Sequence, residues 1–531
     1  MSAGDDASSA PKAGAGEWIG LAVLALPTVL LALDFTVLHL ALPHLAEDLR
    51  PSSTQQLWIL DVYGFMIAGF LITMGTLGDR IGRRRLLMIG ATAFGAASVA
   101  AAYAPTAETL IAARALLGIA GATLMPSTLS LISTMFRDPG QRGFAIAVWL
   151  SCFSAGGAVG PMIGGVMLQW FWWGSVFLMG VPVMLLLLVL GPLLLPEYRA
   201  PESGRLDLVS VALSLACLLP VVYGLKEVAD TGWAPVPAVA IAGGALFGWL
   251  FVRRQHRLDD PLMDLRLFRD RAFSGALVGM LLGLLTLGAF VLLFAQYLQL
   301  VLDLSSVRAG LWMMPYAVAN VVGAMAAPAL AARMPAPYAI AGGLLLSALG
   351  YVLFGQADAA SGGLAWAVAG SLLVTFGLSP LMVLTIDLIV ASAPRERSGA
   401  ASSMSETCSE LGMALGVATL GSVGVAVYRF LIEDAVPADV PPRAAEAARD
   451  SLASTAAVAE ELPSATAAAL LDASREAFLA GLSAVSYTSA LVVVGLAVLV
   501  VTVLRGRQST GESPEEPGPA APERETATGA P

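Results

Sequence analysis

Charged side chains are scarce in this chain. Of its 531 residues only 13% are Asp, Glu, Lys or Arg, whereas 57% are hydrophobic, and the mean hydropathy is +0.78. A soluble protein of this length needs a much larger polar surface than these residues can cover. The composition therefore excludes an ordinary soluble globular protein and favours a protein that lies in a membrane.

Lysine, cysteine and histidine are also rare. The two lysines, Lys12 and Lys226, do not belong to a G-x-x-x-x-G-K-[ST] phosphate-binding loop, which excludes an ATP-driven pump. The three cysteines all fall within apolar runs and are expected to be small buried hydrophobes. Residues 1–17 are polar and the first apolar run is long, so we expect no cleavable signal peptide.

Apolar runs of about 20 residues recur along nearly the whole chain, and each can cross roughly 30 Å of hydrocarbon as a helix. Helix is the expected conformation because no water is available there to satisfy backbone groups. We predict an all-α polytopic membrane protein with fourteen spans, at residues 18–42, 54–76, 85–104, 107–133, 143–168, 175–195, 207–226, 235–252, 273–298, 309–331, 337–356, 364–391, 398–428 and 481–504.

The arginines predict how the chain is oriented. If the N-terminus is inside, the inner loops carry 19 arginines, and the short outer loops carry only Arg50, Lys226 and Arg308. Such a bias is typical of cytoplasmic loops. We therefore expect a multi-pass protein of the cell membrane with both termini in the cytoplasm.

An internal repeat predicts the domain organisation. A shift of 256 residues brings the fifth span onto the thirteenth, so that Gly143 meets Gly399, Cys152 meets Cys408 and Gly156 meets Gly412. Two parallel six-helix bundles with substrate bound between them are a known transporter plan. We predict a tail at 1–17, a bundle at 18–195, two extra helices and a loop at 196–272, a second bundle at 273–504 with a long outer loop at 431–476, and a disordered tail at 505–531.

The stretch Gly75–Leu87, GTLGDRIGRRRLL, lies between two apolar runs and carries one aspartate and four arginines in seven residues. We interpret it as a tight cationic turn at the membrane edge. Its candidate functional residues are Gly75, Asp79, Arg80, Gly82, Arg83 and Arg84.

Several charged residues lie within the predicted spans. A charge near the centre of a bilayer costs at least ~2.5–3.5 kcal/mol, so each such residue is a functional candidate. The acids outnumber the bases, which predicts a polar cavity that attracts protons and organic cations. The alternative is that these groups are structural carboxylates satisfied by backbone or water. The candidates for proton coupling and the substrate cavity are Asp34, Asp61, Arg114, Asp387, Glu406 and Glu410.

The fifth span contains GGAVGPMIGG at residues 156–165. Gly156, Gly160 and Gly164 form one bare stripe that allows a neighbouring helix to approach closely, and Pro161 is expected to bend the helix. Together with Gly165 these residues predict a close helix contact that changes between conformations.

Four motifs together resemble the major facilitator superfamily, and specifically its fourteen-helix drug:proton antiporters. They are LDFTVLHLALP at 33–43, the stretch Gly75–Leu87, the R-x-x-x-G of Arg114 and Gly118, and the antiporter motif Gly156–Gly165. The following WWGSVFLMGVP at 172–182 is similar to quaternary-ammonium and dye efflux pumps of the family.

The resemblance implies a role for each motif. Asp79, Arg80 and Arg83 would form the inner gate, and Arg114 would interact with the proton-coupling acid, Asp34. It also implies a proton-driven antiporter, without a cofactor or metal, that exports cationic amphipathic drugs, antibiotics, dyes or biocides as a monomer. Nucleic acid is not an expected partner, and the protein is not expected to be an enzyme.

Two alternatives stay open at this point. One is a proton-coupled importer of a small organic solute, against which Gly156–Gly165 argues. The other is a membrane-embedded prenyltransferase-like enzyme, in which Asp259, Asp260 and Asp264 would bind Mg²⁺ and diphosphate. These aspartates form an isolated cluster with no second cluster elsewhere, which argues against that enzyme.

Overall fold

The structure is a computed structural model of the 531-residue chain. It describes residues 12–51, 53–197, 207–231, 234–258, 261, 263, 265–358, 362–392, 398–437, 440–459 and 461–504. The expected tail at 505–531 lies outside these residues.

Every regular element in the described part of the chain is helical. The helices are α1 (Ala15–Leu49), α2 (Ser53–Ile81), α3 (Arg83–Ala102), α4 (Ala107–Met135), α5 (Pro139–Trp170), α6 (Ser175–Leu178), α7 (Gly180–Leu194), α8 (Leu208–Thr231), α9 (Pro235–Gln255), η1 (Leu265–Arg269), α10 (Arg271–Gln296), η2 (Tyr297–Val301), α11 (Ser306–Ala331), α12 (Ala336–Phe354), α13 (Gly363–Ser392), α14 (Ser398–Ala435), α15 (Pro442–Asp450), α16 (Leu452–Ala459) and α17 (Ser464–Leu504).

Thirteen spans within the described residues are long and apolar enough to cross a membrane. The number rises to fourteen when the bent α5 is included. The expected polytopic all-α fold is confirmed, and the protein is a multi-pass membrane protein.

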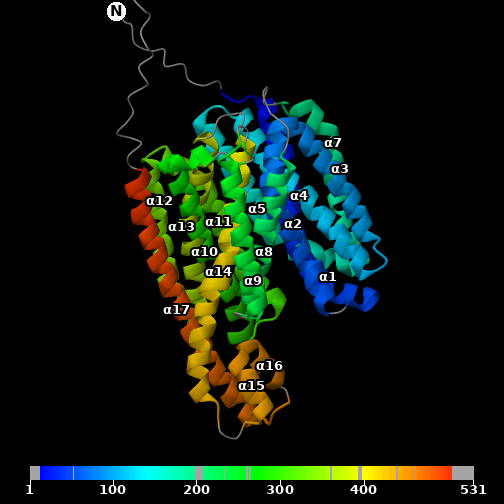
Figure 1. The fold of residues 1–531 in the computed structure, drawn as a ribbon. Helices are drawn as coiled ribbons and strands as arrows, with labels where there is room; N and C mark the ends of the chain where they lie inside the picture. The colour runs from blue at the N-terminus through cyan, green and yellow to red at the C-terminus, as the bar shows by residue number, and fades with distance from the viewer. Residues whose placement is uncertain are drawn as a thin grey trace, which may run out of the picture.

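The helices form two bundles that stand side by side in Figure 1. In the N-terminal bundle α1 packs on α5, and α4 packs on both α2 and α3. In the C-terminal bundle α10 packs on α14, and α13 packs on both α11 and α12. We call the end where α2 meets α3 the basic face, and the end that carries α15 and α16 the distal face.

The internal repeat is visible in how the two bundles are packed. On α5, a Cβ atom added to Gly156 would lie 3.0 Å from backbone atoms of Val29 on α1, and one added to Gly164 would lie 2.8 Å from Val37. On α14, a Cβ atom on Gly412 would lie 2.7 Å from the carbonyl oxygen of Leu281 on α10. Because lipid supplies little hydrophobic driving force between helices, such close backbone contacts hold each bundle together.

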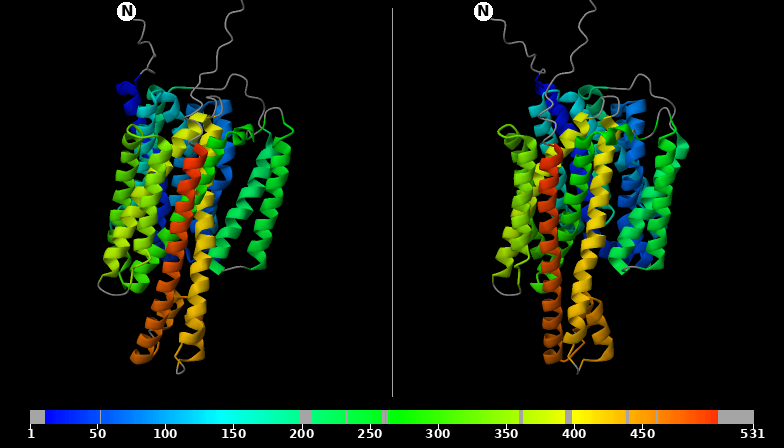
Figure 2. Two further views of the ribbon diagram at one scale, coloured as in Figure 1. Left: turned by 90° about the vertical axis from the view of Figure 1, so that its left-hand side faces the viewer. Right: turned by 60° about the vertical axis from the view of Figure 1, so that its left-hand side comes forward.

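The two extra helices, α8 and α9, form a hairpin at the junction of the bundles (Figures 1 and 2). Helix α8 packs on both α2 and α14, so it contacts both bundles. The base of the hairpin is tied by Arg254, whose Nε donates to Asp207 at 2.7 Å. These hydrogen bonds hold the pKa of the Asp207 carboxyl well below its usual range.

Helices α14 and α17 extend beyond the other helices at the distal face, where α15 packs on α14 and α16 packs on α17 (Figures 1 and 2). The Tyr428 hydroxyl donates to the carbonyl oxygen of Ala448 at 2.6 Å and fastens α15 to α14. The stretch expected as a loop at 431–476 thus contains the end of α14, two short helices and the start of α17.

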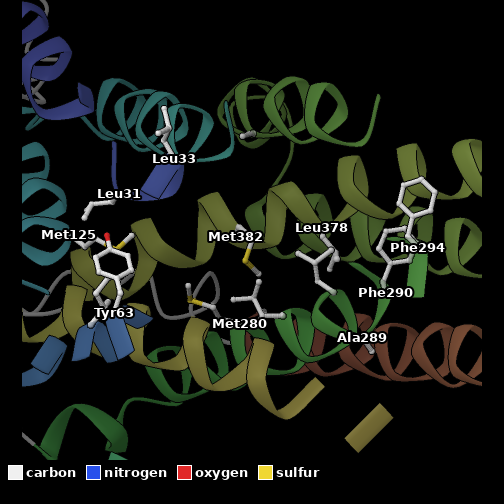
Figure 3. Packing of buried hydrophobic residues seen from close by; sticks show 14 of the residues in the cluster. Leu31, Leu33, Tyr63, Met125, Met280, Ala289, Phe290, Phe294, Leu378 and Met382 are labelled. Atoms are coloured by element: carbon white, nitrogen blue, oxygen red, sulfur yellow. The ribbon is translucent and has the colours of Figure 1, made fainter. Parts of the chain in front are cut away.

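One apolar core runs through both bundles (Figure 3). In the view of Figure 3, Leu31, Tyr63 and Met125 come from the N-terminal bundle, and Met280 and Met382 come from the C-terminal bundle. The two bundles therefore touch through packed side chains in this conformation.

We predict that Gly156→Ala lowers the free energy of unfolding by about 1–3 kcal/mol, because the new methyl group collides with the backbone of α1. Gly157→Ala is the matched control, since an added Cβ there has nothing within 4 Å. The control is expected to be neutral or to stabilise by up to about 1 kcal/mol, because alanine favours helix. Thermal unfolding of the purified variants measures both, and equal effects would contradict the close contact.

Candidate functional site

The two bundles are joined at the basic face by Asp79, which lies in the last turn of α2. Its Oδ1 accepts a hydrogen bond from the backbone N–H of Gly399 at 3.1 Å, and its Oδ2 accepts one from Ala400 at 3.0 Å. Both donors belong to the first turn of α14, where unpaired N–H groups and the helix dipole favour an anion. A carboxylate of one bundle therefore caps a helix of the other.

Arg83 completes this contact. Its Nη2 lies 2.8 Å from Asp79 Oδ1, and its Nη1 donates to the Thr134 hydroxyl at 3.2 Å. The Arg83 side chain is only 1% exposed. A buried ion pair is tolerated when hydrogen bonds satisfy both partners, and here two backbone donors, a guanidinium and a hydroxyl do so. Arg80 is buried as well, at 7% exposure.

Glycines allow this approach. A Cβ atom on Gly399 would lie 2.7 Å from the carbonyl oxygen of Gly75, so neither position has room for a side chain. Gly82 has φ +104°, a conformation that favours glycine, and it turns the chain from α2 into α3. Arg84 then donates to the carbonyl oxygen of Leu195 at 3.0 Å and lies 3.4 Å from Glu197, which ties α3 to the end of α7.

A second ion pair also bridges the bundles. Arg142, in the first turn of α5, places its Nε 2.5 Å from Oδ1 of Asp387 on α13. Asp387 is one of the acids that the sequence analysis assigned to the cavity. In the structure it pairs with Arg142, near the ends of α5 and α13. Two contacts, Asp79 with the N-terminus of α14 and Arg142 with Asp387, therefore join the two bundles at the basic face.

Asp34 and Arg114 form a buried ion pair inside the N-terminal bundle. Arg114 Nη1 lies 2.6 Å from Asp34 Oδ2, and Arg114 is 1% exposed. Its Nε also donates to the carbonyl oxygen of Ile59 at 3.1 Å, and its Cζ lies 4.7 Å from the centroid of the Tyr63 ring. The pair thus joins α1 and α4, as the resemblance to the family implies, and the bond to Ile59 adds α2.

Glu406 and Glu410 lie one turn apart on α14, as the spacing of four residues predicts. Glu406 is 6% exposed, and the two carboxyl groups interact electrostatically. Two carboxylates at this spacing repel each other, so a proton or a cation between them relieves the repulsion.

The remaining predicted residues are placed only in part. Gly156 and Gly164 face α1, whereas an added Cβ on Gly165 has open space around it. Helix α5 bends by 46° between Gly157 and Met162, the stretch that contains Gly160 and Pro161. The side chains of Asp61 and Pro161 lie outside the described part of the structure.

Sequence reasoning missed the seam between α5 and α11. The Ser154 hydroxyl donates to the Asn320 side-chain oxygen at 2.6 Å, and the Ser379 hydroxyl donates to the Asn320 carbonyl oxygen at 3.3 Å. An asparagine within an apolar span was the available signal. Arg142 was counted only as a loop arginine, and its pairing 245 residues away has no local signature.

No group of three or more His, Cys, Asp or Glu side chains that could hold a metal ion occurs among the residues that the structure describes. The cluster Asp259, Asp260 and Asp264 lies outside those residues.

The amino-acid sequence was compared with protein families and with known proteins. The profile of the Major Facilitator Superfamily matches residues 24–417. The multidrug efflux pump LfrA of Mycolicibacterium smegmatis is 45% identical over 92% of this chain and 96% of its own length. The methyl viologen resistance protein SmvA of Salmonella typhimurium is 35% identical, over 87% and 93% of the two chains.

A third relative is the tetracenomycin C resistance and export protein of Streptomyces glaucescens, which is 31% identical over 95% of both chains. Among solved structures, the human organic anion transporter MFSD10 superposes with a TM-score of 0.58. It covers 91% of this chain and 99% of its own, at 18% identity, which supports the fold alone.

We predict that Asp79→Asn opens the basic face more often, because a hydrogen bond to a charged group is worth about 1.5–3 kcal/mol. The measurement is the alkylation rate of a cysteine placed at Ser403, which is fully buried here, in a chain whose native cysteines are replaced by alanine. The rate is expected to rise at least about tenfold. Arg85→Ala, an exposed arginine of the same stretch, is the matched control. Equal rates in the two variants would show that Asp79 does not hold the gate.

Proposed function

The chain belongs to the major facilitator superfamily, a family of membrane transporters rather than enzymes, and from this we propose that it is a proton-driven exporter of lipophilic cations. Its substrates are small molecules, and we infer the classes of antibiotics, dyes and quaternary-ammonium biocides. The names of its relatives support this, because they describe multidrug efflux, methyl viologen resistance and tetracenomycin C export. Export of such compounds confers multidrug resistance.

The observation that carries the proposal is the buried ion pair of Asp34 and Arg114. The pair lies within membrane-spanning helices, where a charge without a partner is expensive. A proton on Asp34 cancels its charge and releases Arg114 from its carboxylate partner. Protonation at this position therefore changes the contacts between α1, α2 and α4, which is what a coupling site must do.

Glu406 and Glu410 supply the second half of the mechanism. They lie on α14, in the C-terminal bundle, and they offer negative charge among neutral side chains of that helix, which include Ser405 and Thr407. We infer that a lipophilic cation binds near these carboxyl groups, with its apolar body against the surrounding side chains. Binding of a cation in one bundle and a proton in the other gives an exchange in which each ligand favours a different conformation.

The basic face is assigned to the cytoplasm of the cell because the arginine-rich turns gather there. The contacts of Asp79 and Arg142 then close the cytoplasmic side, and this conformation corresponds to a step at which substrate cannot return to the cytoplasm. The proton gradient supplies the energy, no cofactor takes part, and one chain is the transporting unit. Both termini lie in the cytoplasm under this assignment.

We predict that Asp34→Asn abolishes the coupling of cation movement to proton movement. Inside-out vesicles with an acid interior and a pH dye receive a lipophilic quaternary ammonium compound, and proton release is followed. Wild-type vesicles are expected to release protons, whereas Asp34→Asn vesicles are expected to release none, because asparagine cannot bind and lose a proton.

Asp207→Asn is the control for this experiment, since Asp207 lies outside the spans and pairs with Arg254. It is expected to release protons as the wild type does. Release from Asp34→Asn at the wild-type rate would move the coupling site elsewhere. Absence of release from all three, with folded protein present in the vesicles, would contradict cation:proton exchange itself.

A further inference from the structure

Tyr63 is a fully buried side chain of α2 that lies against the ion pair of the N-terminal bundle. It is 0% exposed, and the Cζ of Arg114 lies 4.7 Å from the centroid of its ring. In Figure 3 its hydroxyl end points towards Leu31 of α1, one turn before Asp34. The Tyr63 ring thus packs on the guanidinium of Arg114. Its hydroxyl is directed towards α1, the helix that carries Asp34.

The same part of α2 faces the C-terminal bundle. Leu411 of α14 packs against the apolar cluster that contains Phe65 and Ala68 of α2. Glu410 is the neighbour of Leu411 in α14, and α14 packs on α2. The charged groups that interact electrostatically with the Tyr63 hydroxyl are Asp34, Arg114 and Glu410, which come from α1, α4 and α14.

We propose that Tyr63 is a positioning residue that couples the Asp34–Arg114 pair of one bundle to Glu410 of the other. The inference rests on the proposed function, because it concerns how the proton site and the cation site communicate. Tyr63 keeps its own proton throughout, and no proton passes through it. Its role is electrostatic: in a medium of low dielectric, the phenol dipole and ring respond to the charge on each carboxyl group.

This coupling has a mechanical consequence. Because α2 and α14 belong to different bundles, the contact between Tyr63 and the neighbourhood of Glu410 depends on how the bundles are packed. A proton bound at Asp34 therefore alters the affinity at Glu410 before the basic face opens. Linkage requires the reverse effect as well, so a cation near Glu410 alters the proton affinity of Asp34 by the same factor.

The test is a double-mutant cycle on proton-linked binding. The affinity of the purified full-length protein for tetraphenylphosphonium is measured against pH for the wild type, Tyr63→Phe, Glu410→Gln and the double variant. Tyr63→Phe keeps the ring over Arg114 and removes only the hydroxyl. We expect Tyr63→Phe to change the affinity for tetraphenylphosphonium at about pH 6 by at least roughly threefold, equivalent to about half a pH unit. In the Glu410→Gln chain we expect the same substitution to leave the affinity unchanged.

Tyr351→Phe is the matched control, because Tyr351 is another buried tyrosine, 1% exposed, that packs on Phe290 in the C-terminal bundle. Its pH profile is expected to equal that of the wild type. An unchanged profile for Tyr63→Phe, or effects of Tyr63→Phe and Glu410→Gln that simply add, would overturn the coupling. If binding to the wild type does not depend on pH, the proposed cation:proton exchange fails, and the coupling fails with it.

A second measurement covers the case in which Tyr63→Phe does not fold. A 3-fluorotyrosine at position 63 differs from tyrosine by one small atom, and its ¹⁹F signal reports the local electrostatic field. The signal is expected to shift when tetraphenylphosphonium binds and to lose most of that shift in the Glu410→Gln chain. A shift of the same size in both chains would contradict the inference.

Discussion

The carboxylate of Asp79 on the N-terminus of α14 is the interaction on which the rest of this structure depends. It is a contact between a charge and backbone N–H groups that lie 320 residues away in the chain, and it joins the two bundles beside their shared apolar core. Arg83 balances the charge, and Gly75 and Gly399 permit the approach. A contact of this kind can form and break as a unit, because neither partner needs to unfold.

Close packing holds each bundle together, whereas specific polar contacts join one bundle to the other. Within each bundle, glycines of α5 and α14 place their backbones directly against α1 and α10, and these contacts repeat at the offset of the internal duplication. Among the described residues, the polar contacts between the bundles include Asp79 with α14, Arg142 with Asp387, and Ser154 with Asn320. Helix α8 packs on both α2 and α14 and so contacts both bundles at that junction.

Local patterns in the sequence predict much of this arrangement, because apolar length, glycine spacing and buried charge are local properties. They predict the helices, the glycine contact on α5 and the common face of Glu406 and Glu410, whereas the pairing of Arg114 with Asp34 was implied by the resemblance to the family. They do not predict the partner of Asp387 or the capping of α14 by Asp79, since such contacts depend on how the two bundles are set against each other. The extension of α14 and α17 beyond the other helices was also not predicted, because alanine-rich sequence favours helix equally in a loop segment and in a span.

We infer that the charge on Asp34 controls whether the basic face is closed. The most direct test is the distance between spin labels at Arg85 and Met334, both exposed and on opposite bundles at that face, measured by double electron–electron resonance in the wild type and in Asp34→Asn under the same conditions. We predict a short distance for the wild type and a longer one for Asp34→Asn, because asparagine carries no charge to pair with Arg114. Equal distances in the two proteins would contradict control of the basic face by Asp34.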